Sequence, residues 1–217
     1  MSPGRAAVAA ATLALLLAVG CGGDDRASAA VDALLAAGPG QPVTVSLRGI
    51  DTEARVGHGE HAGKTALMLA AQQGRLALVD GLLREGARVD ADNGRGGTAL
   101  MFAATAGHLD VVSRLLEAGA DPDRAAHNGW TALMLATVKG EAALVQRLVA
   151  AGASVDQADV YGFTPLMRAA EQRDEAMMGL LLELGAEPGR TNDAGATAAE
   201  ILAAVRGTGA GMPAGGG

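Results

Sequence analysis

One four-residue pattern recurs through this chain at a fixed interval of 33 residues, and this interval limits the possible folds more than any other feature. The pattern is Thr-Ala-Leu-Met in three copies, Thr-Pro-Leu-Met in the fourth and Thr-Ala-Ala-Glu in the last. The Thr residues that begin the copies are Thr65, Thr98, Thr131, Thr164 and Thr197. A constant interval of this length is typical of stacked repeat proteins, in which each repeat buries its apolar surface against its neighbours.

Each repeat predicts two short helices joined by a tight turn. The Thr can cap the first helix, because its hydroxyl accepts an otherwise unpaired backbone N–H, and Pro165 suits the first helical position. The second helix carries apolar pairs at helical spacing. Glycines with a positive φ are expected in the turn and after the second helix. They are Gly74, Gly107 and Gly140 in the turns, and Gly86, Gly119, Gly152 and Gly185 after the second helices. Arg173 replaces the turn glycine of the fourth repeat, where we expect a local distortion.

Polar, turn-rich segments of eleven residues, such as 120–130 and 153–163, separate the repeats and predict projecting hairpins. The last repeat supplies only one helix, from Thr197 to about Val205, and has Glu200 where the other repeats have Met. A terminal repeat needs a wettable outer face, so this helix predicts a C-terminal cap. Residues 207–217 are mostly glycine and predict a disordered tail.

The repeat start, the turn glycine, the Leu-Leu-x-x-Gly-Ala end and the Asp before the next hairpin together resemble the ankyrin repeat. The resemblance implies an all-α solenoid of helix-turn-helix units with β-hairpin fingers, made of four full repeats and partial terminal repeats. We expect the repeat domain to span residues 54–206, and a half repeat with a strand or loop inserted at 39–53 to occupy residues 22–53. Met stands where the family has His, and we interpret these Met side chains as core residues that can only pack. They are Met68, Met101, Met134 and Met167.

Residues 1–21 predict an export signal. Arg5 is followed by an apolar run over 6–19 and by Gly20 and Cys21, and this run is shorter than a typical membrane span. The segment 17–21 resembles the lipobox of bacterial lipoproteins, which implies cleavage before Cys21 and lipid attachment to it. The position three residues before Cys21 holds Ala where Leu is usual, so a plain secretory signal, a retained anchor or an incidental thiol in a discarded peptide stay open. We expect the chain in the cell envelope or periplasm as a membrane-anchored lipoprotein, and otherwise secreted. With no second Cys, an exported domain cannot rely on disulfides.

The charge of the chain limits its partners. The formal net charge is -7 and the pI is about 5.0, which argues against a surface for nucleic acid or for anionic lipid headgroups. A neutral or basic protein partner is easier to accommodate. We expect a monomer whose only link to a membrane is the N-terminal lipid.

No pattern in the sequence supports catalysis, and we expect neither enzyme activity nor a cofactor. The one candidate is His58-x-x-His61 with Glu60 beside it, which could bind zinc. No helix fixes that spacing and no third strong ligand lies nearby in the sequence, so we interpret the segment as a solvated finger tip and expect no metal site. A metal-dependent enzyme that uses His58 and His61 is the alternative. His108 stands at the start of a second helix, where a structural hydrogen bond is the default.

The ankyrin resemblance implies binding of another protein along a concave surface made of finger tips and first helices. Three of the four aromatic side chains fall in two neighbouring fingers, and large aromatic side chains dominate interface energetics. The predicted protein-binding residues are Trp130, Tyr161, Phe163, Arg95, His127, Asn128 and Lys139. Two alternatives stay open. The aromatic residues could stiffen the hairpin stack instead of binding, and the protein could be a structural envelope scaffold without a discrete hot spot. Phe102 is expected in the core.

Overall fold

The structure, a computed structural model, describes Arg55 and residues 62–208. The chain divides into two compact units, and the boundary between them in the sequence lies between Asp121 and Pro122. The regular secondary structure of these residues is helical, which confirms the predicted all-α repeat class. Isolated bridges between single residues take the place of hairpin strands within the described part of the chain. The predicted export signal with Cys21, the 39–53 insertion and the pair His58 and His61 lie outside the described residues.

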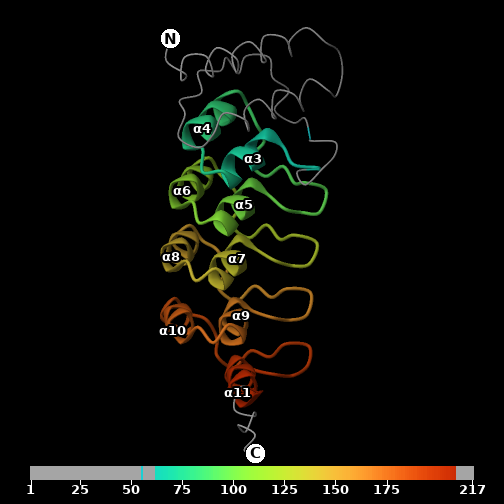
Figure 1. The fold of residues 1–217 in the computed structure, drawn as a ribbon, viewed down its shortest axis with the longest axis vertical. Coiled ribbons are helices and arrows are strands. Elements are labelled where there is room, and N and C mark those ends of the chain that lie inside the picture. Colours follow the sequence, from blue (N-terminus) through green and yellow to red (C-terminus); the bar gives the residue numbers. More distant parts are fainter. Residues whose placement is uncertain (1–54, 56–61, 209–217) are drawn as a thin grey trace, which may run out of the picture. The chain divides into compact units, whose positions relative to one another are not determined.

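The described part of unit 1 contains two helix pairs (Figure 1). The first pair is α3 (Ala66–Gln72) with α4 (Leu76–Arg84), and the second is α5 (Ala99–Ala106) with α6 (Leu109–Glu117). The first helices α3 and α5 pack against each other, and so do the second helices α4 and α6. The apolar faces of each pair are therefore covered by the neighbouring pair, as the repeat pattern predicts.

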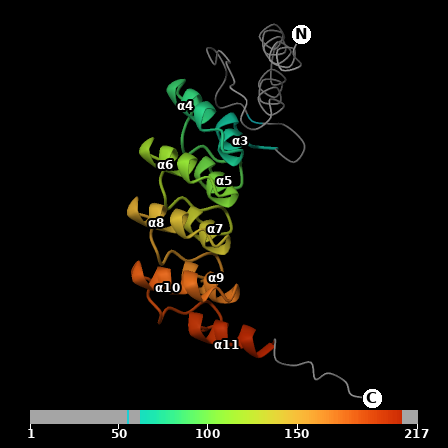
Figure 2. The ribbon, with the colours of Figure 1, turned by 60° about the vertical axis from the view of Figure 1, so that its left-hand side comes forward.

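Up to residue 208, where the described part of the chain ends, unit 2 contains two further pairs and a single last helix (Figure 2). The helices are α7 (Ala132–Val138), α8 (Ala142–Ala150), α9 (Pro165–Glu171), α10 (Glu175–Glu183) and α11 (Ala198–Thr208). Helix α9 packs against α7, α10 and α11 and is the centre of this unit. Helix α11 continues two residues into the predicted tail, and the rest of that tail lies outside the described residues. None of the helices that the structure describes is long and apolar enough to cross a membrane.

The repeated Thr residues cap the first helices as predicted. The side chains of the first four each accept a hydrogen bond from the backbone N–H three residues later, at 3.3 to 3.5 Å. The Met at this third position is buried in all four repeats. Met68 also accepts a hydrogen bond at its sulfur from the backbone N–H of Thr65, at 3.4 Å. The expectation that these Met residues can only pack is therefore wrong for Met68, since thioether sulfur is a weak acceptor.

The expected distortion at Arg173 is wrong. Its φ of 59° is close to the 73° of Gly140 one repeat earlier, so the fourth repeat keeps the same turn. A left-handed conformation costs a residue other than glycine about 1–2 kcal/mol. Asp174, the next residue, accepts a hydrogen bond from the backbone N–H of Met177 at 2.9 Å, and a side-chain cap of this kind contributes about 1 kcal/mol. The cap on α10 thus offsets much of the strain beside it.

Backbone hydrogen bonds join the fingers of unit 2. The N–H of Val160 donates to the carbonyl oxygen of Asn128 at 3.2 Å, and the N–H of Asp193 donates to the carbonyl oxygen of Tyr161 at 3.1 Å. Gly129 allows this close approach, because a Cβ atom on it would lie 2.6 Å from the Cα atom of Asp159. Main-chain hydrogen bonds therefore hold these finger tips in register, and the bonds do not depend on which side chains the fingers carry.

Gly129 and Gly195 provide a matched test of this close approach. Both have nearly the same positive φ, 80° and 77°, but a Cβ atom on Gly195 would meet nothing within 4 Å. We expect Gly129→Ala to lower the free energy of unfolding by about 1–3 kcal/mol more than Gly195→Ala, because only the first adds an overpacking cost to the shared backbone strain. Urea unfolding of both variants measures the difference. Equal losses would mean that the fingers do not pack as closely as described.

Glu200 caps the last helix. Its carboxylate accepts hydrogen bonds from the backbone N–H and from the hydroxyl of Thr197, both at 2.8 Å, and its own N–H donates to that hydroxyl at 3.4 Å. This reciprocal arrangement is a capping box. The hydrogen bonds from Thr197 lower the pKa of Glu200 below its ordinary value of 4.5.

We expect the start of α11 to loosen as the pH falls below about 4.5. A carboxyl group whose pKa is lower in the folded state stabilises that state above its unfolded pKa, and the contribution is lost as the pH falls through the folded pKa. The amide proton resonance of Thr197 in an NMR titration reports the change. Glu200→Gln is the control, since Gln keeps an acceptor and does not titrate, and an identical transition in that variant would contradict the assignment.

Candidate functional site

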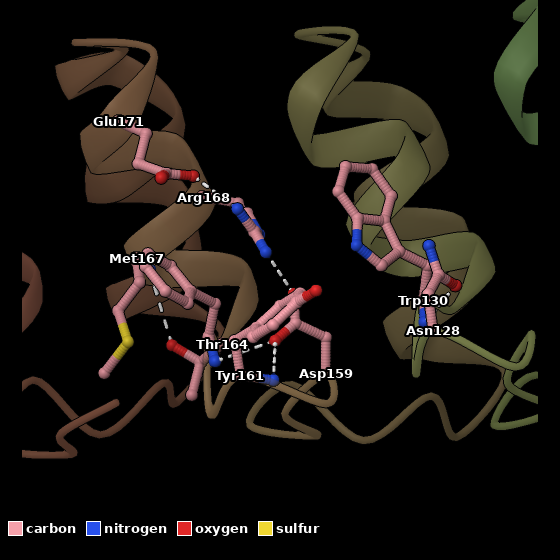
Figure 3. A network of polar contacts seen from close by, with 9 residues as sticks. Asn128, Trp130, Asp159, Tyr161, Thr164, Met167, Arg168 and Glu171 are labelled. Atoms are coloured by element: carbon pink, nitrogen blue, oxygen red, sulfur yellow. Dashed lines mark hydrogen bonds and ion pairs between the residues drawn. The ribbon is translucent and has the colours of Figure 1, made fainter. Parts of the chain in front are cut away.

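Arg168 lies at the centre of a cluster of aromatic and charged side chains in unit 2 (Figure 3). It is on α9, and the corresponding position is apolar in the other repeats, as at Leu135 and Ile201. Its side chain is only 14% exposed. An Arg at this depth needs partners for its charge, because burying an unpaired guanidinium is costly.

Two aromatic rings lie beside the Arg168 guanidinium. Its Cζ atom is 4.2 Å from the centroid of the Phe163 ring and 5.2 Å from the centroid of the Trp130 ring. Cations at these distances are attracted to the negative faces of aromatic rings by about 0.5–2 kcal/mol, depending on exposure. Phe163 and Trp130 belong to successive repeats, so Arg168 links the two repeats.

Two carboxylates complete the charge balance around Arg168. Nη2 donates to Oδ2 of Asp159, and Nη1 donates to Oε2 of Glu171 at 2.7 Å. Burial by itself would lower the pKa of Arg168, but these two carboxylates outweigh it and raise the pKa above its ordinary value. The guanidinium therefore stays charged at neutral pH.

Asp159 uses its two oxygens for different purposes. While Oδ2 accepts from Arg168, Oδ1 accepts from the backbone N–H groups of Tyr161 at 2.9 Å and Phe163 at 3.0 Å. Burial would raise the pKa of Asp159, but the hydrogen bonds from Arg168 and from the two N–H groups prevail and hold it below its ordinary 3.8. One buried carboxylate thus fixes both the finger backbone and the position of Arg168.

Two other fingers show that the first of these roles does not require a charge. Asn93 and Asn192 stand at the same repeat position as Asp159, and each accepts hydrogen bonds at Oδ1 from the N–H groups two and four residues later. Asn is neutral and supplies this turn as well as Asp does. The carboxylate at position 159 is needed only for Arg168.

Unit 1 has a simpler contact of the same kind. The Nζ atom of Lys64 lies 4.7 Å from the centroid of the Phe102 ring and donates to the side-chain oxygen of Gln72 at 2.8 Å. Phe102, expected in the core, is half-buried under this cation. Nε2 of His108 lies 3.2 Å from the carbonyl oxygen of Gln72, which confirms the structural hydrogen bond expected for this His.

The predicted binding residues differ in exposure. Tyr161 is 65% exposed, whereas Trp130 and Phe163 are half-buried beside Arg168. The remaining four predicted residues are exposed; His127, Asn128 and Lys139 lie in unit 2, and Arg95 lies in unit 1. Their role in binding stays a prediction. The structure brings Trp130 and Phe163 together through Arg168, which the sequence analysis missed.

No group of three or more His, Cys, Asp or Glu side chains is placed to hold a metal ion among the residues that the structure describes. His58 and His61 are not among those residues.

We expect Asp159→Asn to lower the free energy of unfolding by about 2 kcal/mol. Asn at this position keeps the two turn hydrogen bonds but leaves Arg168 with Glu171 as its only carboxylate, and a hydrogen bond to a charged group is typically worth about 1.5–3 kcal/mol. Asp159→Ala should cost more, because it also removes the turn acceptor. Urea unfolding followed by the fluorescence of Trp130, the only Trp, measures both. A loss as large in Asp159→Asn as in Asp159→Ala would contradict the division of roles between the two oxygens.

Comparison with known proteins places the chain in a family. The model of three ankyrin repeats matches residues 15–126 and again residues 119–192. No curated protein matches the chain. Ankyrin repeats generally mediate protein–protein interaction, and proteins built from them are typically not enzymes. Because the two matches together cover most of the sequence and the helix pairs have the arrangement that the resemblance implies, the chain belongs to the ankyrin repeat family.

Proposed function

We propose that this chain is an exported, lipid-anchored protein that binds an envelope or extracellular protein through the fingers and first helices of its ankyrin repeats. The observation that carries the proposal is the cluster around Arg168, together with the exposed Tyr161 on the same finger as Asp159 and Phe163. We name this surface the aromatic face and define it as Trp130, Tyr161, Phe163 and Arg168.

The aromatic face is ordered before any partner arrives. Tyr161 and Phe163 are held through their backbone N–H groups by Asp159, and the Trp130 ring lies against the Arg168 guanidinium. A surface that is already ordered loses little conformational entropy on binding, so more of its contact energy appears as affinity. Interface hot spots are enriched in Trp, Tyr and Arg, the residue types that meet here.

The proposed export and lipid anchor depend on the sequence of the N-terminal segment. The apolar run over 6–19 and the sole Cys of the chain, Cys21, fit a bacterial lipoprotein signal. A lipid on Cys21 would hold the repeats close to a membrane surface. The acidic repeats themselves offer little attraction to anionic headgroups, which is why we propose the lipid on Cys21 as the link to the membrane.

A crosslinked pull-down from the envelope fraction tests the proposed binding. We expect the wild-type chain to capture one protein that is lost when Trp130, Tyr161 and Phe163 are all replaced by Ala. Leu182→Ala is the matched control, because Leu182 is 43% exposed but lies on a second helix, α10, away from the fingers. Circular dichroism must show unchanged helical content in both variants.

The results of the pull-down distinguish binding through the aromatic side chains from a purely structural role for them. Capture of the same protein by the wild type and the triple variant would mean that the aromatic side chains only stabilise the finger stack. Capture of nothing by any form would count against the binding function itself. Incorporation of an alkyne-labelled fatty acid, abolished by Cys21→Ser, tests the anchor separately, and labelling that persists in Cys21→Ser would reject it.

A further inference from the structure

We propose that Tyr161 and Asp193 form the contact at which the aromatic face accepts a Lys or Arg side chain of its partner. The inference rests on the proposed binding function and names the chemistry of the partner: a protein segment that presents a basic side chain to the finger tips of unit 2.

Tyr161 is the most exposed large hydrophobic side chain in the described part of the chain. It is 65% exposed, and its neighbour Val160 is 52% exposed, so two of the four such side chains are adjacent at the tip of one finger. The ring of Tyr161 therefore presents most of its surface to solvent. An exposed aromatic face attracts ammonium and guanidinium groups.

The backbone that carries this ring is fixed on three sides. Tyr161 donates its N–H to Asp159 and accepts at its carbonyl from Asp193, and Val160 donates to Asn128. Gly162 leaves room for the next finger, since a Cβ atom there would lie 2.8 Å from the backbone nitrogen of Asp193. The tip does not have to become ordered when a partner binds.

The carboxylate of Asp193 lies on the neighbouring finger, close to the backbone of the residue that follows Tyr161. Its Oδ1 atom is 2.9 Å from the position that a Cβ atom on Gly162 would occupy, one residue from Tyr161. Asp193 is exposed. An exposed ring on one finger and an exposed carboxylate on the adjoining finger are suited to a Lys or Arg, which can place its alkyl stem on the ring and donate to the carboxylate.

The charges around the site favour a cation. Arg168, the base nearest to the aromatic rings, is paired with both Asp159 and Glu171, so these three groups together carry one negative charge. Asp193 adds another. Acidic residues also outnumber basic ones over residues 122–208. An acidic segment of a partner would meet net repulsion here, whereas a basic one would be attracted.

Selection from a displayed library of random twelve-residue peptides against the full chain tests the proposal. We expect the selected peptides to share a Lys or Arg at one position. Replacing a selected Arg by citrulline, which has nearly the same shape and no charge, should weaken binding about tenfold, because a cation–π contact and a charged hydrogen bond are lost together. Incorporation of 3-fluorotyrosine labels only Tyr161, the single Tyr of the chain, and its fluorine resonance should move on binding of the Arg peptide.

Four variants connect this result to the site. Tyr161→Leu removes the π face but stays apolar, and Asp193→Asn removes the charge but leaves the backbone N–H that bonds to Tyr161; each should weaken binding severalfold, while Tyr161→Phe should retain it. Leu182→Ala should bind as the wild type does.

Three results would overturn the proposal. They are selected peptides that lack basic residues, a citrulline peptide that binds as well as the Arg peptide, and failure to select any peptide. The pull-down could still capture a partner through the aromatic face in each of these cases, so failure of this inference is distinguishable from failure of the proposed function.

Discussion

A pair of helices seven to nine residues long cannot bury its own apolar surface, and this constraint governs the rest of the structure. Leu133 and Leu148 are almost fully buried, and within each unit the first helices of successive repeats pack on one another. Each repeat therefore has to start and turn at the same positions as its neighbour, so that their apolar surfaces face each other. The Thr cap at the start of each first helix and the positive φ of the turn that follows fulfil that requirement at the same two positions of each full repeat.

The functional surface depends on a second constraint, which is the cost of placing a charge where the other repeats have an apolar residue. Arg168 is acceptable on α9 because Asp159, Glu171 and two aromatic rings surround it. Asp159 has two roles among these groups, because one of its oxygens accepts from Arg168 while the other holds the finger backbone. Loss of the whole Asp159 side chain would affect the finger tip and the aromatic face together, whereas loss of its charge alone would affect only the pairing with Arg168.

The two units use the same physical contact with the roles exchanged. In unit 1 a cation lies at the position just before a repeat Thr, at Lys64, and the aromatic ring is on a first helix, at Phe102. In unit 2 the aromatic rings occupy the position before the Thr, at Trp130 and Phe163, and the cation is on the helix. A cation–π contact links successive repeats in either arrangement. Only the arrangement in unit 2 places an exposed aromatic side chain, Tyr161, on the adjoining finger.

The sequence alone determined the repeat architecture, because each signal that specifies it acts over a few residues. The hydroxyl of Thr131 caps a backbone group three residues away, and the glycine at 140 is recognised by its place after a short helix. The same reasoning failed at Arg173, where the packing of the neighbouring helices and the cap from Asp174 impose a left-handed backbone that the residue type does not favour. The preference of one residue was overruled by the repeat around it.

Only the tertiary structure decided which side chains form the candidate site. Trp130 and Phe163 were predicted from the sequence as binding residues on two neighbouring fingers. The group that joins them, Arg168, comes from the helix of the later repeat and is paired with a carboxylate nine residues before it. The sequence did contain one signal of this cluster, which is the Arg at a repeat position that is apolar in the other repeats. Its partners could not be chosen from the sequence, since charge pairing in a stacked repeat depends on which finger and which helix lie beside each other in space.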